Sequence, residues 1–163
     1  MRWIWIDRFV SFKSGEEATA VKNVTLAEEH LHDHFPAYPT MPATLILEGM
    51  AQTAGLLVGE ARQFSEKVIL AKVGNAVFHC EVLPGDQIIH HARIVSIDAD
   101  AAAAEGTVTR KGRQGEIQPV ADISLMFSHI DQNLAGKQFP EENFVFTDQF
   151  IQLVDSLRQA GEA

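Results

Sequence analysis

The chain has 163 residues, which fits one domain of ordinary size with at most a short appendage. Hydrophobic residues make up 46% and charged residues 21%, a composition that excludes a disordered chain and a collagen-like chain. The 13 Lys and Arg residues against 22 Asp and Glu residues give a formal charge of −9. That charge argues against binding to nucleic acid or to an anionic membrane surface, because both depend on basic side chains.

Cysteine content and hydropathy indicate the cellular compartment of the protein. Cys80 is the single cysteine, so no internal disulfide is possible and a structural zinc site is disfavoured. The longest apolar run, residues 43–59, carries Glu48 and Gln52 in its interior and is short for a membrane span. The N-terminus lacks the apolar core of a signal peptide. The sequence therefore predicts a reduced, cytoplasmic protein.

The first elements are predicted to be strands. Residues 6–12 and 18–24 have a strand-like pattern, and the turn signal at 14–17 joins them into a hairpin. The polar stretch 28–40 contains three histidines and two prolines. Its pattern fits neither the helical nor the strand period, so it is predicted to be a loop.

A buried helix is predicted over residues 42–59. Pro42 suits a first helical turn, and the apolar residues that follow cover nearly every side of the helix. Gly49, Gly55 and Gly59 are costly in an isolated helix, but in a buried one they allow a sheet or a second helix to approach closely.

Four more strands follow, predicted over residues 68–78, 86–97, 102–110 and 116–128 with turn signals between them. Residues 136–143 are predicted to be a linker, and apolar residues then recur at helical spacing from Phe146 to Leu157, with Thr147 or Asp148 as N-cap.

We therefore predict an α+β fold in which a long antiparallel sheet wraps around one apolar central helix. Residues 1–130 would form this domain, and residues 131–163 a linker with a C-terminal amphipathic helix.

Glu48 is the only charged residue of the central helix. Such a carboxylate either lies on a surface-facing stripe, or is structural and hydrogen-bonded, or is functional, with a raised pKa that lets it hold or donate a proton. Gln52 lies four residues later on the same face and can hydrogen-bond to Glu48. A polar pair on an apolar helix favours the functional interpretation.

Histidines gather at His30, His32 and His34. If extended, they would share one face, and a metal site is conceivable. The stretch need not be extended, however, and no further Cys or His lies at metal-ligand spacing, so we predict no metal. His34 precedes Phe35-Pro36, where the proline stiffens the backbone, and such a loop can present an imidazole as a base. Cys80 is interpreted as a small core residue rather than a nucleophile.

The segment from His34 to Gln52 resembles the signature of 3-hydroxyacyl-[acyl-carrier-protein] dehydratases of the FabZ type. That signature runs His-Phe-Pro-Gly-x-Pro-x-x-Pro-Gly-x-Leu-x-x-Glu-x-x-x-Gln. The similarity extends over about residues 4–130 and includes Asp7-Arg8 and the turn at 83–86. The resemblance implies the hot-dog fold, which agrees with the element order deduced above.

The resemblance also implies an activity: removal of water from a 3-hydroxyacyl thioester to give a trans-2-enoyl thioester. It makes His34 the base, Glu48 the acid and the backbone N–H of Ala43 the oxyanion donor. Family active sites combine the histidine of one subunit with the glutamate of its dimer partner, so a homodimer or a trimer of dimers is implied. No metal or organic cofactor is required.

Further site residues complete the expectation. Gln52 would support Glu48, and an apolar tunnel beside the central helix would hold the acyl chain. The predicted tunnel residues are Phe35, Pro42 and Phe78. The substrate would be carried by acyl carrier protein or coenzyme A. The −9 charge weakens the case for acidic carrier proteins, although a local basic patch at 110–113 could suffice.

Two departures from the signature leave alternatives open. Ala37 and Ala43 replace both signature glycines. Alanine keeps the N–H of residue 43, but its methyl group could crowd the substrate, and a positive φ there would disfavour alanine. The alternatives are another hot-dog thioester enzyme, a thioesterase or hydratase, and a non-catalytic acyl-binding scaffold, which only the two alanines favour. The segment after residue 131 lies beyond the usual end of the family.

Overall fold

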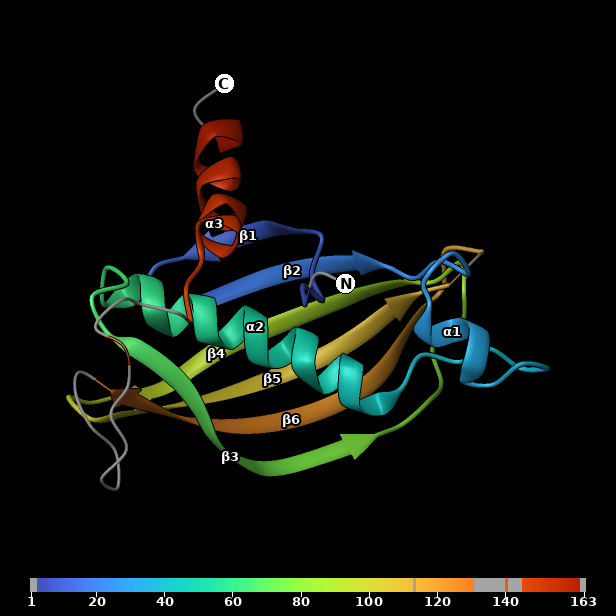
Figure 1. Ribbon diagram of the computed structural model, residues 1–163, viewed down its shortest axis with the longest axis horizontal. Coiled ribbons are helices and arrows are strands. Elements are labelled where there is room, and N and C mark those ends of the chain that lie inside the picture. Colours follow the sequence, from blue (N-terminus) through green and yellow to red (C-terminus); the bar gives the residue numbers. More distant parts are fainter. Residues whose placement is uncertain (1–2, 113, 131–139, 141–144, 162–163) are drawn as a thin grey trace.

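The computed structural model describes residues 3–112, 114–130, 140 and 145–161. It consists of one six-stranded antiparallel sheet that curves around a long helix, with a second helix at the C-terminus (Figure 1). The elements are β1 (Arg8–Lys13), β2 (Glu17–Asn23), α1 (His30–Asp33), α2 (Ala43–Ala61), β3 (Lys67–Phe78), β4 (Gln87–Ile97), β5 (Ala101–Lys111), β6 (Ile117–Ile130) and α3 (Asp148–Gly161). This is the predicted hot-dog fold.

The sheet order is β1-β2-β4-β5-β6-β3, with every pair antiparallel. All six predicted strands and both predicted long helices are present. The one difference is the short helix α1 inside the predicted loop, where Leu31, only 1% exposed, anchors a helical turn to the core. Apart from Pro140, the predicted linker at 136–143 lies outside the described residues.

The central helix packs against the concave face of the sheet because the facing strand carries small residues. Ala102 and Ala104 of β5 are buried, and a Cβ added at Gly106 would overlap the side chain of Met50 on α2. The alanines and the glycine are mediocre strand formers, yet they are what lets this helix approach the sheet closely.

The C-terminal helix α3 packs on β1, and the segment that precedes it reaches the core (Figure 1). Phe146 is 7% exposed and Val154 is 1% exposed, and both belong to the same apolar cluster as α2. The ring of Phe146 lies 5.0 Å from that of Phe64 in an edge-to-face contact. The C-terminal segment is therefore an integral layer of the structure.

Strand β3 forms one outer edge of the sheet and exposes apolar side chains. Leu70, Val73, Val77 and Phe78 are 36–44% exposed. Edge strands present unpaired backbone groups and are normally shielded.

Within the described residues, no helix is long and apolar enough to cross a membrane.

We predict that His90 makes stability dependent on pH. His90 is fully buried in β4 beside Gly49, and burial, helped by the charge of Lys22, lowers its pKa from 6.5 to about 3. The unfolded chain binds a proton near pH 6.5 while the folded chain does not. The free energy of unfolding should therefore fall as the pH drops below 6.5, by up to about 1.4 kcal/mol per pH unit.

Urea denaturation at pH 7 and pH 5 measures this effect, with His90→Asn as the comparison. The native chain should lose about 2 kcal/mol more than the variant between the two pH values. An identical pH dependence in both proteins would contradict the assignment.

Candidate active site

His34 lies at the C-terminal end of α1, and a backbone carbonyl fixes its ring. The Nδ1 of His34 is 2.8 Å from the carbonyl oxygen of Thr40, and the backbone N–H of Thr40 donates back to the His34 carbonyl at 2.9 Å. A carbonyl can only accept, so Nδ1 carries the proton and donates it. The neutral ring therefore keeps Nε2 as its free lone-pair nitrogen, the form needed in a base.

The N-terminus of α2 adjoins the same histidine. Pro42 caps the helix, and its carbonyl accepts the N–H groups of Leu45 and Ile46. Helix geometry leaves the N–H groups of Ala43 and Thr44 without an intrahelical acceptor, at the positive end of the helix dipole. This end of α2 can stabilise an oxyanion.

His34 and Ala43 line one cavity of about 470 Å³. Its wall comes from the loop before α2, the first turns of α2 and the segment that follows β3. The lining residues are His34, Phe35, Thr40, Met41, Ala43, Ile46, Phe78, His79, Cys80 and Glu81.

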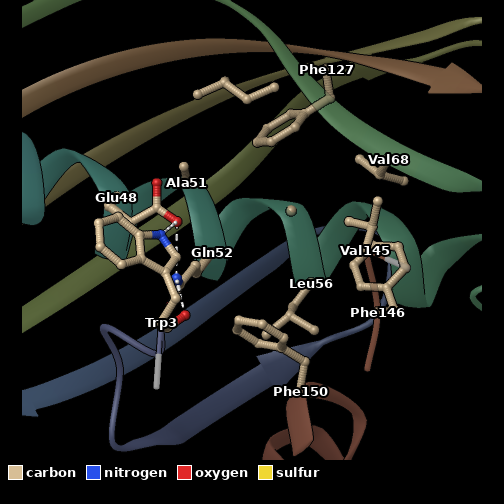
Figure 2. A pocket seen from close by; sticks show the side chains of 12 residues that line it. Trp3, Glu48, Ala51, Gln52, Leu56, Val68, Phe127, Val145, Phe146 and Phe150 are labelled. Atoms are coloured by element: carbon tan, nitrogen blue, oxygen red, sulfur yellow. Dashed lines mark hydrogen bonds between the residues drawn. The ribbon is translucent and has the colours of Figure 1, made fainter. Parts of the chain in front are cut away.

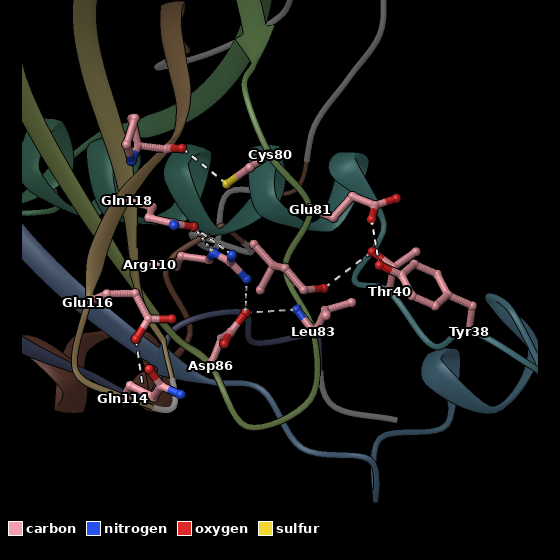
Figure 3. A network of polar contacts seen from close by, with 12 residues as sticks. Tyr38, Thr40, Cys80, Glu81, Leu83, Asp86, Arg110, Gln114, Glu116 and Gln118 are labelled. Carbon is pink, nitrogen blue, oxygen red and sulfur yellow. Dashed lines mark hydrogen bonds and ion pairs between the residues drawn. The ribbon is translucent and has the colours of Figure 1, made fainter.

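Hydrogen bonds hold the loop before α2 against the segment after β3 (Figure 3). The hydroxyl of Tyr38 donates to Glu81 at 2.9 Å, and the Thr40 hydroxyl donates to the Val82 carbonyl at 3.3 Å. The N–H of Met41 donates to the same carbonyl at 2.8 Å. These contacts fix the position of the His34 ring relative to the helix N-terminus.

A partly buried ion pair supports the same segment (Figure 3). Arg110 donates to Asp86 at 2.7 Å, and the Asp86 carboxylate also accepts the N–H of Leu83 at 3.0 Å. The hydrogen bond to Asp86 raises the pKa of the Arg110 guanidinium. The charge of Arg110 is therefore paired with Asp86 within the fold. Arg113, the other arginine of the expected basic patch, lies outside the described residues.

Glu48 forms a second polar centre further along α2 (Figure 2). Its Oε1 accepts hydrogen bonds from the indole Nε1 of Trp3 at 3.0 Å and from the Nε2 of Gln52 at 2.9 Å. Gln52 also donates to the Trp3 carbonyl at 3.1 Å and accepts the N–H of Trp5 at 2.8 Å. The half-buried carboxylate is thus held by two donors, while Oε2 has no protein donor among these contacts.

Glu48 lines a separate, mainly apolar cavity of about 250 Å³ that runs along α2 (Figure 2). Residues of the N-terminal segment, α2, β3, β6 and the C-terminal segment surround it. They are Trp3, Glu48, Ala51, Gln52, Gly55, Leu56, Val68, Leu70, Phe127, Val145, Phe146 and Phe150.

Neither cavity contains both His34 and Glu48. Glu48 is five residues after Ala43, which turns its side chain about 140° around the helix axis from that of Ala43. In one chain the expected base and acid therefore belong to two different cavities on different sides of α2.

Two of the three expected tunnel residues, Phe35 and Phe78, lie at the His34 cavity, and Pro42 lines neither cavity. Phe78 lines the His34 cavity, and Phe35, 56% exposed, stacks on the His34 ring with centroids 4.2 Å apart. Pro42 caps α2 and is not among the lining residues. Ala37 and Ala43 both avoid positive φ, which among described non-glycine residues occurs only at Gln63 and Phe64.

Two residues of these sites were not identified from the sequence. Trp3 has no motif around it, and only the folded chain brings it to Glu48. His79 lies just after the predicted strand 68–78; it follows β3, lines the His34 cavity and has its Nε2 2.7 Å from Asp122. Its position just before the turn at 83–86 was the one signal available.

Comparison with known proteins identifies relatives for most of the chain. The FabA-like domain model matches residues 3–114. The 3-hydroxyacyl-[acyl-carrier-protein] dehydratase FabZ of Listeria welshimeri is 34% identical over 130 residues, covering 79% of this chain and 87% of that protein. FabZ of Bartonella henselae is 44% identical over 95 residues, covering 57% and 61%.

Solved structures of thioesterases share the fold at low identity. The 4-hydroxybenzoyl CoA thioesterase from Pseudomonas sp. strain CBS-3 aligns with a TM-score of 0.57 and 13% identity, covering 85% of this chain and 99% of that one. A thioesterase family protein from Silicibacter pomeroyi aligns with a TM-score of 0.61 and 14% identity, covering 76% and 83%.

We predict that Gln52→Leu destabilises the protein by about 1–3 kcal/mol, because it leaves the buried N–H of Trp5 without its acceptor. The exposed Gln149 of α3 provides a matched control, and Gln149→Leu should change stability by less than about 0.5 kcal/mol. Chemical denaturation measures both values. Equal stability of the two variants would show that the Gln52 hydrogen bonds contribute nothing.

Proposed function

The chain belongs to the FabA-like domain family, and from that premise we propose that it is a dehydratase that converts 3-hydroxyacyl thioesters into trans-2-enoyl thioesters. The FabZ names of its relatives support this reaction class. The observation that carries the proposal is the hydrogen bond from His34 Nδ1 to the Thr40 carbonyl, which prepares Nε2 as a base in the cavity that holds the helix N-terminus.

In the proposed reaction, His34 Nε2 removes a proton from C2 of the substrate. The negative charge that develops on the thioester oxygen is stabilised by the N–H of Ala43 and the helix dipole. Glu48 protonates the 3-hydroxyl, the C3–O bond breaks, and water leaves as the C2–C3 double bond forms. The Trp3 and Gln52 donors keep the Glu48 carboxyl in one orientation during this proton transfer.

The proposal requires His34 and Glu48 to meet, and a second copy of the chain can achieve this. Phe78, at the C-terminal end of β3, lines the His34 cavity, whereas Val68 and Leu70, near its N-terminal end, line the Glu48 cavity. The two cavities thus adjoin opposite ends of one edge strand. Val68 and Phe78 are about 30 Å apart along that strand.

Antiparallel pairing of two β3 edges would place the C-terminal end of one strand beside the N-terminal end of the other. A two-fold axis near Val73 then brings the His34 cavity of each copy to the Glu48 cavity of the other. The apolar side chains on this edge favour such a contact. We therefore propose a homodimer with two shared sites, alone or as the unit of a trimer of dimers, acting on thioesters carried by acyl carrier protein.

A thioester assay tests the activity. The purified protein is mixed with 3-hydroxyacyl and trans-2-enoyl thioesters of acyl carrier protein and of coenzyme A, while enoyl absorbance and free thiol are followed. We expect interconversion of the two acyl forms without thiol release. Thiol release alone would assign a thioesterase, and no reaction with any substrate would assign an acyl-binding scaffold.

Substitutions test the residue roles. His34→Ala and Glu48→Gln should each lower kcat by about 10²–10⁴-fold, since each removes one proton-transfer partner. The two losses should not add in the double variant, because both groups act on one transition state. A His34→Ala variant as active as the native protein would contradict the mechanism.

Mixing the two single variants tests whether the site is shared. In a mixed dimer one site lacks both groups, while the other keeps both and should be active. The double variant His34→Ala/Glu48→Gln is the matched control, because its mixture with either single variant leaves no complete site. Equal activity of the test and control mixtures after subunit exchange would refute a shared site.

A further inference from the structure

The C-terminal segment forms part of the wall of the cavity beside Glu48. Val145, Phe146 and Phe150 line it together with α2 and β3, and all three lie beyond residues 3–114, where the family model matches. Figure 2 shows Trp3 and Glu48 toward one end of the cavity and Val145 and Phe146 toward the other, with α2 running between them. This C-terminal segment thus supplies an aromatic wall to the cavity.

Packing holds this wall in place. A Cβ at Gly59 would overlap the ring of Phe146, so the glycine provides the space that the ring occupies on α2. Phe64 makes an edge-to-face contact with this ring, and Phe146 is only 7% exposed. Val154 and the packing of α3 on β1 anchor the segment that carries Phe150.

The spacing along α2 sets the depth of the cavity. Gly55 is seven residues beyond Glu48, or about 10 Å at the helical rise, and Gly59 is about 16 Å beyond it. An extended carbon chain advances about 1.2 Å per bond. A chain whose C3 lies at Glu48 can therefore extend by about eight bonds before it reaches Gly55. The next residue, Leu56, lines the cavity there, and Figure 2 shows Phe150 next to it, with Phe146 further on at Gly59.

We propose that Phe146 and Phe150 form the closed end of the acyl-binding cavity and limit the substrate to acyl chains of about ten carbons. The inference rests on the proposed function, because it places C3 of the acyl chain at Glu48. The mainly apolar lining is suited to a hydrocarbon chain, and Glu48 supplies the polar group at the reacting end. The C-terminal segment is then a specificity element for the same reaction.

The test compares kcat/KM for 3-hydroxyacyl thioesters of four to sixteen carbons. In the native protein, kcat/KM should fall by about tenfold or more between ten and fourteen carbons. Phe150→Ala should raise the fourteen-carbon value by about tenfold while changing the four-carbon value less than about twofold. Phe150→Trp should move the limit to shorter chains. Gln149→Ala, an exposed neighbour on α3, should behave as the native protein does.

A chain-length profile that is the same in the native protein and both Phe150 variants would overturn the proposal. Phe146→Leu, which keeps an apolar side chain on Gly59, serves as a second variant if Phe150→Ala does not fold. Calorimetric binding of unreactive saturated acyl-coenzyme A thioesters of the same lengths separates the two hypotheses. If no substrate turns over, the proposed function fails. The longest acyl chain that still binds is then compared between the native protein and the variants. A change in this length supports Phe146 and Phe150 as the closed end of the cavity, and an unchanged length refutes it.

Discussion

The close contact between α2 and the sheet is the constraint on which the rest of the structure depends. Gly106 leaves room for Met50, and Gly49 leaves room for the fully buried ring of His90. These contacts fix the distance between the helix and the sheet and the rotation of the helix about its own axis. The same helix then presents three features in a fixed relation: a free N-terminus at Ala43, a hydrogen-bonded carboxylate at Glu48, and a glycine at Gly59 that receives Phe146.

A single rigid helix also explains why His34 and Glu48 belong to different cavities within one chain. The rotation of about 140° between Ala43 and Glu48 around the helix axis turns Glu48 away from the cavity that holds His34. Both cavities reach β3, which is one of the two edge strands of the sheet. In the proposed dimer, the pairing that would shield the edge strand would also complete the site, so association and activity would be coupled.

Much of this fold could be predicted from the sequence because its signals are local. The apolar run from Ala43 to Gly59 indicated a buried helix, and alternation with turn residues indicated the strands. The pairing of Gln52 with Glu48 followed from helical spacing alone. Each of these patterns depends on residues that are close in sequence, which is where periodicity is informative.

The remaining features depend on contacts between distant segments. The indole of Trp3 reaches Glu48 across 45 positions, and no spacing rule connects them. The amphipathic pattern of α3 indicated a helix but not the surface that it covers, and the fit of Phe146 onto Gly59 appears only when both segments are folded.

The most direct test of a shared site is a crystal structure with a non-reactive 3-hydroxyacyl amide of about ten carbons. The account predicts that the carbonyl oxygen accepts the N–H of Ala43, with C2 beside Nε2 of His34 from the same copy. It also predicts the 3-hydroxyl beside Glu48 of the second copy and the alkyl end against Phe150. A ligand that reaches His34 and Glu48 within one copy, or that reaches neither, would contradict it.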